Sequence, residues 1–538
     1  MYGATPAHRC RGLILTLKLR LTGHEYKYAI EQIMLALFPS EKPDYSFDPI
    51  SGSDELSADS RLSFGSAYAQ VVTVIRCGDK VSRGISRVKR DRLSGKLLSD
   101  RLIKRIVIQS FYRAALRHIE TPPVWGSLTG IRPAHLAARA LEAGQSERSA
   151  MRTLSRDYYV STERSAMCTQ AAKSSLALKR TLAPEDIALY VGIPFCPTRC
   201  AYCSFVSNSV EKSFGLIEPF VQTLLNEIDA AAAVVSKLGL RIISVYIGGG
   251  TPTSLPAEGF ESVMLALKKM FDLSCVREYT VEAGRPDTID ERKLEIMGRF
   301  GVNRICVNPQ SMSAEVLSAI DRRHTPGDVA KAVRLVRQLN TTDSTGFEPQ
   351  NRNVSKPLFT GTGASGQTPK MALNMDIIAG LPSDSPEGFR HTLDTILDFM
   401  PESITVHTLS QKKGSRIMVE GSDIPDGTNV AKMLDYASCN LRKNGYTPYY
   451  LYRQKFTSGG FENTGWSLPG YEGIYNICMM EELCTVLALG AGGVTKLVSP
   501  GGRIERIFNA KYAREYILLA DKFSSKFNKV MDFQAQLL

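Results

Sequence analysis

Short apolar runs alternate with longer amphipathic segments through the middle of the chain. Each run has the length of a buried strand, and the intervening segments, such as residues 216–237, have helical periodicity. Buried strands separated by helices imply a parallel sheet covered by helices, and right-handed crossovers curl six such units into an open barrel. The sequence therefore predicts an α/β fold with a partial (β/α)6 TIM-like barrel, whose strands are 187–193, 242–247, 279–282, 304–307, 372–378 and 403–408.

Residues 1–180, which precede this pattern, mix strand-like and helix-like periodicity and are predicted to form an α+β N-terminal domain. Thr121-Pro-Pro ends the last helix before a Trp- and Gly-containing turn, because proline cannot continue a helix. The predicted elements are strands at 13–21 and 68–76, helices at 26–38, 97–118 and 147–182, and a polar loop at 40–60.

The barrel is predicted to span residues 181–411, with an interruption at 340–370. That interruption is rich in Gly, Ser, Thr, Asn and Pro, and we expect a disordered insertion, since lengthening a surface loop costs little closure entropy. Residues 412–538 form the third predicted part, a small C-terminal region that covers the substrate. Its aromatic-rich segments, 445–456 and 462–477, either line a pocket for a flat ligand or pack the end of the barrel, and packing is the default interpretation.

The composition is that of an ordinary globular protein, with 538 residues, of which 43% are hydrophobic and 22% charged. No apolar run reaches the roughly 18 residues of a membrane span, so we expect a cytoplasmic protein. The net charge of +12 suits nucleic acid, a phosphate- or carboxylate-rich ligand, or an acidic electron-transfer protein. Basic residues gather in segment 83–117 at roughly helical spacing, and a solvated helix face is favoured there over a nucleic-acid site.

Three of the eleven cysteines have the spacing of metal ligands. Cys196, Cys200 and Cys203 follow the first predicted strand in the order C-x3-C-x2-C. Because a [4Fe–4S] cluster normally takes four thiolates, three cysteines leave one iron open to another ligand. A structural zinc loop is the alternative, but it needs a fourth Cys or His, and none lies between Ser204 and Gly248. The other eight cysteines are expected to pack as ordinary free thiols.

Further unusual residues fall where predicted strands end. Gly248 to Thr253 follow the second strand, Glu282 ends the third and Gln310 follows the fourth. In parallel barrels the chemistry gathers at the C-terminal edge of the strands. These residues are therefore expected to face the cysteine loop.

The motifs CPTRCAYC and GGGTPT together resemble the radical S-adenosylmethionine (radical SAM) enzymes, in the branch of oxygen-independent coproporphyrinogen III dehydrogenase. WGSLTGIRP, NPQSM, VHTLS and PYYLYRQK extend the resemblance to the HemZ-type branch and over nearly the whole chain. The resemblance implies a radical SAM barrel in which Cys196, Cys200 and Cys203 bind a [4Fe–4S] cluster. It also implies that S-adenosylmethionine is held by Tyr190, Tyr202, Gly249, Gly250, Thr251, Glu282, Gln310, Arg322, Asp376 and, less directly, Ser410.

The same resemblance implies a reaction and its partners. A flavodoxin- or ferredoxin-type donor would reduce the cluster, and the cofactor would initiate oxidative decarboxylation of coproporphyrinogen III propionates to vinyl groups, which gives protoporphyrinogen IX. The candidate propionate partners are Arg132, Arg453, Lys412 and Lys413. The alternatives are a structural turn for Arg132 and solvated surface for the two lysines.

The sequence departs from the dehydrogenases at two points. Phe205 stands where they have an additional cysteine, and their N-terminal Tyr-Pro segment has no counterpart here. At Phe205 the chain is similar to the haem-chaperone relatives. A HemW-like haem-binding chaperone is therefore the alternative function, and a nucleic-acid-modifying radical SAM enzyme is the least favoured one.

Overall fold

The computed structural model describes residues 16–38, 41–45, 56–203, 208–341, 371–410, 415–417, 424–454 and 457–535. The chain divides into two compact units, the first made of residues 1–131 and 144–166 and the second of residues 132–143 and 167–538. The division into parts at 180 and 411 stays a prediction. The predicted insertion at 340–370 lies, beyond residue 341, outside the described residues.

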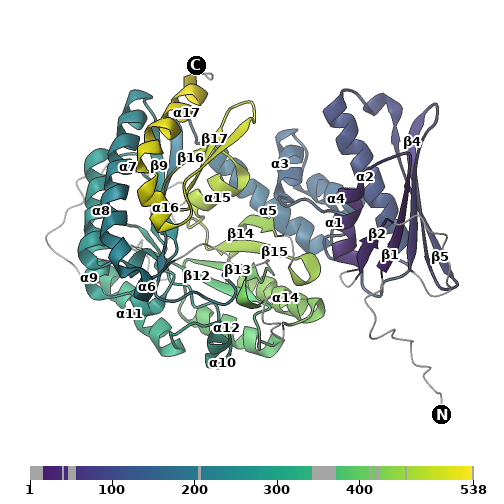
Figure 1. Cartoon of the computed structure of the whole chain (residues 1–538). Coiled ribbons are helices and arrows are strands. Elements are labelled where there is room, and N and C mark those ends of the chain that lie inside the picture. Colours follow the sequence, from purple (N-terminus) through teal and green to yellow (C-terminus); the bar gives the residue numbers. More distant parts are fainter. Residues whose placement is uncertain are drawn as a thin grey trace, which may run out of the picture. The chain divides into compact units, whose positions relative to one another are not determined.

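The first unit is a five-stranded sheet with helices packed against it (Figure 1). Its strand order is β2-β1-β3-β4-β5, with β1 parallel to β2 and β3 and the other pairs antiparallel. Apolar residues from the strands, α1 and α2 form one core. The elements are β1 (Thr16–Thr22), α1 (Lys27–Leu37), β2 (Lys42–Asp44), β3 (Ser57–Phe64), β4 (Tyr68–Cys77), β5 (Lys80–Lys89), α2 (Lys96–Ala115) and α4 (Glu147–Tyr158).

Two sequence-based assignments in this unit are wrong. The polar segment 40–60 contains β2 and the start of β3, because strand pairing outweighs its low hydrophobicity. The basic segment that begins at Arg83 is not helical throughout, since its first part is β5 and the helix begins at Lys96. Arg83, Arg87 and Lys89 alternate with buried residues on β5, so their charges lie on one solvated strand face.

The second unit contains the six predicted parallel strands, so the predicted α/β fold is confirmed. These are β6 (Asp186–Ile193), β9 (Arg241–Gly249), β10 (Glu278–Val281), β11 (Arg304–Cys306), β12 (Ala372–Ala379) and β13 (Ser403–Thr408). They lie side by side in chain order, each parallel to the next. The same sheet has eleven strands in all in the described part of the chain.

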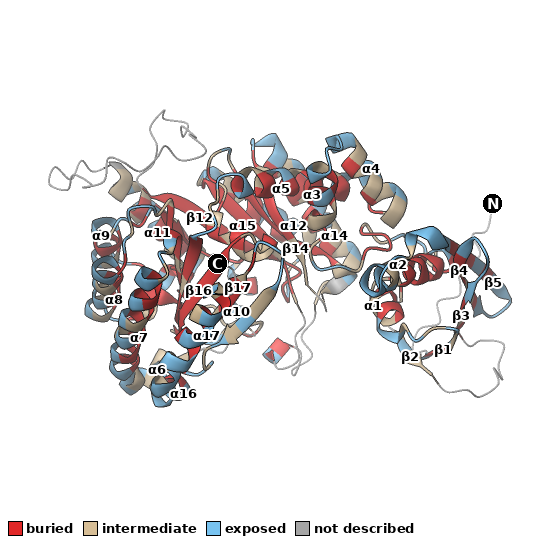
Figure 2. Cartoon of the chain, turned by 90° about the horizontal axis from the view of Figure 1, so that it is seen from above, coloured by how far each residue is buried: buried red, intermediate tan, exposed pale blue. Residues whose placement is uncertain are grey.

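Helices between these strands cover the outer face of the sheet, with α7, α8, α9 and α11 in a row (Figure 1). Figure 2 shows their exposed sides outward and their buried sides toward the strands. The helices of this unit are α3 (Ala134–Glu142), α5 (Thr162–Lys179, whose first residues belong to the first unit), α6 (Val210–Ser213), α7 (Ile217–Lys237), α8 (Ala257–Met270), α9 (Glu291–Arg299), α10 (Ala314–Ala319), α11 (Pro326–Thr341), α12 (Pro386–Asp398), α14 (Gly427–Lys443), α15 (Ile474–Glu481), α16 (Ala513–Leu518) and α17 (Phe523–Ala535).

Residues beyond 411 extend the parallel sheet at both ends. After β13 the order continues with β15 (Glu462–Ser467) and β14 (Thr447–Arg453), both in antiparallel pairing. Before β6 it continues with β16 (Thr485–Gly490), which is parallel to β6, and then β17 (Val494–Val498) and β18 (Ile504–Phe508).

A buried ion pair fastens the C-terminal helices to this sheet. Glu227 of α7 is fully buried and accepts hydrogen bonds from Lys526 Nζ (2.8 Å) and Asn509 Nδ2 (3.0 Å). It also accepts from the Tyr516 hydroxyl and from the backbone N–H of Gly490 at the end of β16. One carboxylate therefore connects α7, α16, α17 and β16.

Among the described residues, no helix combines the length and the apolarity that crossing a bilayer requires.

Candidate functional site

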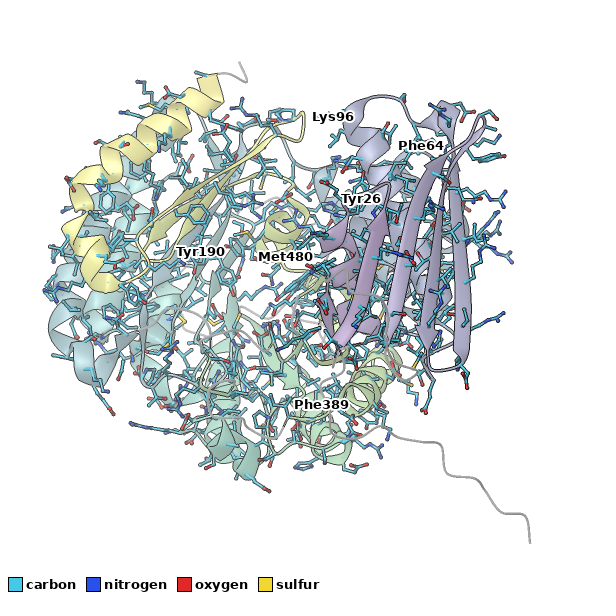
Figure 3. The ribbon with its side chains drawn as sticks, turned by 45° about the vertical axis from the view of Figure 1, so that its right-hand side comes forward. Tyr26, Phe64, Lys96, Tyr190, Phe389 and Met480 are labelled. Carbon is cyan, nitrogen blue, oxygen red and sulfur yellow. The ribbon has the colours of Figure 1, made fainter. Side chains whose placement is uncertain are left out.

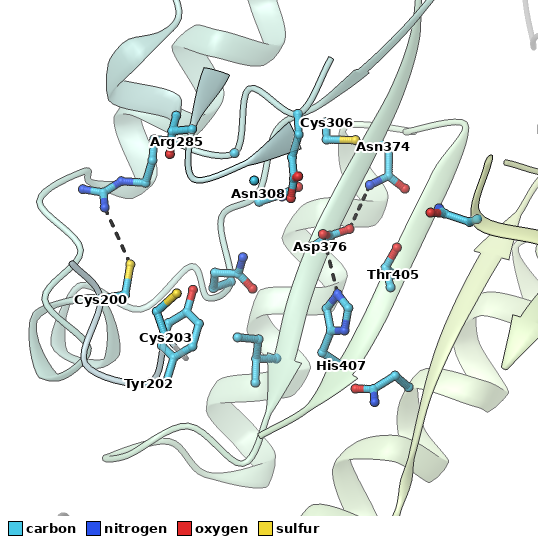
Figure 4. A pocket seen from close by; sticks show the side chains of 18 of the residues that line it. Cys200, Tyr202, Cys203, Arg285, Cys306, Asn308, Asn374, Asp376, Thr405 and His407 are labelled. Atoms are coloured by element: carbon cyan, nitrogen blue, oxygen red, sulfur yellow. Dashed lines mark hydrogen bonds and ion pairs between the residues drawn. The ribbon is translucent and has the colours of Figure 1, made fainter. Parts of the chain in front are cut away.

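A cavity of about 330 Å³ lies in the second unit, along the parallel strands and at their C-terminal ends. Its lining comes mainly from the cysteine loop and the strands β9 to β15, and partly from α15 (Figure 4). Of the predicted site residues, it brings together Cys196, Cys200, Cys203, Tyr202, Gly249, Gly250, Thr251, Glu282, Gln310, Arg322, Asp376 and Ser410.

Tyr190 is the predicted site residue that does not line this cavity. Its ring lies in an aromatic stack with Tyr246 and Tyr475, at centroid distances of 6.2 and 6.0 Å (Figure 3 labels Tyr190). Tyr246 does reach the cavity wall. Tyr246 on the neighbouring strand β9, and not Tyr190, therefore lines the cavity.

Two of the candidate propionate partners, Arg132 and Arg453, do not line the cavity. Arg132 pairs with Glu482, at 2.7 Å between Nη2 and Oε1. Arg453 donates to the carbonyl of Gly460, at 3.0 Å from Nε and 2.7 Å from Nη2. Lys412, Lys413 and Phe205 lie outside the described residues.

The three cysteines lie in a short loop that follows β6 and begins with the two-residue strand β7 (Phe195–Cys196). All three are reduced cysteines of intermediate exposure. The hydroxyl of Thr251 donates to Cys196 Sγ at 3.6 Å, and Nη1 of Arg285 donates to Cys200 Sγ at 3.6 Å. The sulfurs of Cys196 and Cys200 are therefore each held by a residue that follows a neighbouring strand, β9 or β10.

Glycines allow the C-terminal end of β9 to approach this loop closely. The backbone N–H of Gly250 donates to the carbonyl of Ile193 at 2.7 Å. A Cβ on Gly250 would lie 2.5 Å from the Phe195 carbonyl oxygen and 3.0 Å from Cys196 Sγ. Gly249 has a φ of +108°, a backbone conformation that side chains other than glycine rarely adopt. Both positions therefore require glycine.

Arg322 follows α10 and reaches across the cavity toward the loop. Its Nη2 donates to the Tyr202 hydroxyl at 2.9 Å, and its Nη1 donates to the carbonyl of Gly284 at 2.8 Å. Its Nε is buried without a hydrogen-bond partner, as are Oε1 of Gln310 and Oδ1 of Asn308. Buried polar atoms are seldom left unsatisfied, so these atoms indicate a polar ligand.

Two carboxyl groups in the cavity have pKa values shifted in opposite directions. Burial, with the charge of Asp376, raises the pKa of Glu282 to about 7. Burial also acts to raise the pKa of Asp376, but hydrogen bonds from His407, Asn374 and Thr405 outweigh it and lower the pKa. Asn374 Nδ2 donates to Asp376 at 2.8 Å, and His407 Nε2 lies 3.6 Å from its other oxygen (Figure 4). Near neutral pH Asp376 is ionised while Glu282 is partly protonated.

The raised pKa of Glu282 predicts how the stability of the folded protein depends on pH. In the unfolded chain the carboxyl has its ordinary pKa of about 4.5, so between that pH and about 7 the folded state holds a proton that the unfolded state has lost. Raising the pH through this interval therefore lowers the stability of the cofactor-free protein. Glu282→Gln removes the titration, so its unfolding temperature relative to wild type should rise from pH about 5 to about 8 in thermal unfolding.

Glu258→Gln is the control for this prediction, since Glu258 is an exposed glutamate of α8. Its difference from wild type should be nearly independent of pH. An equally flat profile for Glu282→Gln would contradict the assigned pKa.

Several cavity residues were missed by the sequence analysis. Cys306 was assigned to ordinary packing, yet it lines the cavity at the end of β11. Burial, followed by the charges of Asp376 and Glu282, raises the pKa of its thiol well above the usual range, so it stays protonated. Other polar examples include Arg285, Asn308, Asn374, Thr405 and His407, and their common signal is a polar residue inside or just beyond a predicted parallel strand.

Among the described residues, no group of three or more His, Cys, Asp or Glu side chains is gathered closely enough for a single metal ion. A four-iron cluster sets a different requirement, because each thiolate binds a different iron. The cysteine loop, the glycine cradle at Gly250 and the unpartnered polar atoms together fit a cluster with a polar ligand beside it.

Comparison with known proteins agrees with this arrangement. Residues 190–349 match the family model of the radical SAM superfamily. The chain is 34% identical over 420 residues to the oxygen-independent coproporphyrinogen-III oxidase-like protein HemZ of Bacillus subtilis (strain 168), covering 77% of this chain and 78% of that protein. The chain belongs to the radical SAM superfamily and, within it, to the HemZ-like family of oxygen-independent coproporphyrinogen-III oxidase-like proteins.

Two further matches are more distant. The heme chaperone HemW of Buchnera aphidicola subsp. Schizaphis graminum (strain Sg) is 26% identical over 265 residues, which cover 49% of this chain and 61% of that protein. Among solved structures, coproporphyrinogen III oxidase (HemN) from Escherichia coli matches with a TM-score of 0.47 and 18% identity, covering 65% of this chain and 72% of that one.

The family resemblance predicted from the cysteine and glycine motifs is confirmed. The cofactors of the radical SAM superfamily are a [4Fe–4S] cluster and S-adenosylmethionine, as the sequence predicted.

Proposed function

We propose that this protein is a radical SAM enzyme of porphyrin biosynthesis, which converts propionate side chains of coproporphyrinogen III to vinyl groups without oxygen. The observation that carries the proposal is one cavity in which three cysteines face Glu282, Gln310, Arg322 and Asp376. The similarity to a protein named as coproporphyrinogen-III oxidase-like supports the choice of substrate.

In this proposal Cys196, Cys200 and Cys203 hold the cluster, and the residues of the facing strand ends hold S-adenosylmethionine. When bound, the two cofactors supply one-electron reductive cleavage and hydrogen-atom abstraction. At each propionate the substrate loses one hydrogen atom, one carbon dioxide molecule and one electron, which leaves a vinyl group. The electron passes to an external acceptor, and a flavodoxin- or ferredoxin-type protein supplies the reducing electron.

Each side chain suits a group of S-adenosylmethionine with complementary charge or hydrogen-bonding capacity. Arg322 has an unpartnered Nε and suits the carboxylate of the methionine moiety. Ionised Asp376, held by Asn374 and His407, suits the ribose hydroxyls. Glu282 and Gln310 supply acceptor oxygens for the amino group. Tyr202 also lines the cavity, and the hydrogen bond from Arg322 to its hydroxyl fixes the position of its ring.

Gly250→Ala is a test of the cradle that these strand ends form. The new Cβ would meet the Phe195 carbonyl and Cys196 Sγ, so the cysteine loop must move. We expect a stability loss of about 1–3 kcal/mol and a lower cluster content after reconstitution. Iron and sulfide per chain and the unfolding midpoint are the measurements.

The matched control is Gly259→Ala on the outer helix α8, where the nearest side-chain contact to an added Cβ is an ordinary 3.6 Å. This change should keep the cluster and stabilise the helix by up to about 1 kcal/mol. Equal cluster content in both alanine variants would contradict the cradle.

The second candidate function is a HemW-like haem chaperone, which the similarity to a protein of that name favours. Its prediction is stable haem binding followed by transfer to an apo-acceptor. A nucleic-acid-modifying enzyme is the least favoured proposal. The basic residues of β5 alternate with buried residues and lie on one solvated strand face, and a basic face alone does not indicate a nucleic-acid site.

The deciding experiment is anaerobic turnover of the reconstituted protein with S-adenosylmethionine, reductant and coproporphyrinogen III. We expect 5′-deoxyadenosine and products with one and two vinyl groups. A loaded cluster without vinyl product would reject the decarboxylation, and haem transfer in a parallel assay would then support the chaperone.

A further inference from the structure

Arg285 lies in the loop after β10, three residues beyond Glu282, and its side chain is only 2% exposed. A buried guanidinium is costly unless its charge and its N–H groups are satisfied. The role of this arginine is therefore indicated by the groups that it contacts.

Three of its nitrogens contact defined partners, and two of these partners belong to the cysteine loop. Nη1 donates to Cys200 Sγ at 3.6 Å and to the Thr198 carbonyl at 3.4 Å, and Nη2 donates to the Thr198 hydroxyl at 3.1 Å. Nε lies 3.3 Å from Asp287, a carboxylate with 26% exposure. Figure 4 shows the guanidinium pointing toward the Cys200 sulfur.

The fork geometry fixes where the positive charge lies. Thr198 binds two of the nitrogens, and its hydroxyl also donates to the Asp321 carbonyl at 3.3 Å. The guanidinium therefore cannot turn away from Cys200 without breaking several hydrogen bonds. Its carboxylate partner, Asp287, is partly exposed to water and therefore neutralises the charge incompletely.

A cationic N–H donor at a cluster sulfur has a known physical effect. One-electron reduction adds negative charge to a cluster, and hydrogen bonds to its sulfurs favour the reduced state. A charge-assisted hydrogen bond has a larger effect than a neutral one. Cys196 receives a neutral hydroxyl donor from Thr251, so the donor at Cys200 is the stronger of these two.

We propose that Arg285 is a positioning residue that holds the Cys200 thiolate and raises the reduction potential of the cluster. A weaker electron donor can then reduce this protein than could reduce it without the arginine. The inference rests on the proposed function only in that Cys200 is a cluster ligand.

The test is an anaerobic redox titration of the reconstituted cluster, followed by electron paramagnetic resonance, in wild type and Arg285→Gln. At a fixed solution potential we expect the ratio of reduced to oxidised cluster to fall about tenfold in the variant, the effect of losing one charge-assisted hydrogen bond. For a one-electron couple that is a shift of about 59 mV to more negative potential.

Arg292→Gln is the matched control, because it removes the same charge from an exposed arginine of α9. Its midpoint should equal that of wild type. Equal midpoints in all three proteins would overturn the inference while leaving the cluster site intact, whereas a wild type that binds no cluster would reject the proposed site itself.

Arg285→Lys decides the question if Arg285→Gln assembles no cluster. A single ammonium cannot serve Thr198 and Cys200 together as the guanidinium fork does. Its midpoint is therefore also expected below that of wild type. An unshifted midpoint in this variant would overturn the inference.

Discussion

Replacement of Cys200 by alanine is expected to reduce the cluster content of the reconstituted protein by about tenfold or more, since metal affinity depends on the complete set of ligands. Cys200 is half-buried, so the loss of its sulfur leaves the strands of the sheet unchanged. Iron and sulfide per chain and the visible absorption of the cluster measure the effect. Formation of 5′-deoxyadenosine should disappear with the cluster.

Cys306→Ala is the informative control for this experiment. Cys306 lines the same cavity, but its thiol stays protonated and is not assigned as a ligand. Cys275→Ala provides a second control at an exposed thiol. A cluster that survives in Cys200→Ala, or is lost in Cys306→Ala, would contradict the assignment of ligands.

The second large effect is expected at the buried ion pair. Lys526→Met leaves the Glu227 carboxylate buried without its cation, and breaking such a pair costs about 3–5 kcal/mol. Three other donors to Glu227 remain, from Gly490, Asn509 and Tyr516, so the loss should fall near the lower end. The measurement is the free energy of unfolding of the second unit in the full-length protein, obtained from urea titration.

Lys179→Met removes a lysine from the exposed pair with Glu142 and should cost no more than about 1 kcal/mol. The double change Glu227→Gln with Lys526→Met should recover part of the loss, because it also removes the buried charge. A Lys526→Met protein as stable as the Lys179→Met protein would show that water reaches the Glu227 carboxylate.

The parallel sheet was predictable because its strands are buried on both faces. Ile187, Ile242 and Ile404 begin apolar runs that have few alternative structures, and the structure has strands at all six predicted positions. The strands β3 and β5 were missed for the opposite reason. The start of β3 carries the polar residues Ser57, Asp59 and Ser60, so its composition indicated a loop. The exposed positions of β5 carry Arg83 and Arg87, so its composition indicated a helix.

The candidate site was predictable where a residue's position in the chain is informative. Glu282 and Gln310 follow strands, and the topology alone brings such residues to one edge. Arg285 and His407 were missed because their roles depend on which way a side chain turns. Tyr190 shows the same limit, since alternation along β6 directs its ring into a stack with Tyr246 rather than to the cavity wall.

The position of β16 has a consequence for how this protein matures. The strand that leads into the cysteine loop, β6, lies between β9 and β16 in the sheet. During synthesis β9 follows soon after β6, but residues 485–490 leave the ribosome only after the rest of the parallel sheet. Until then one edge of β6 has unpaired N–H and C=O groups and can pair with other chains. Cluster insertion is therefore expected after translation, once β16 has closed that edge.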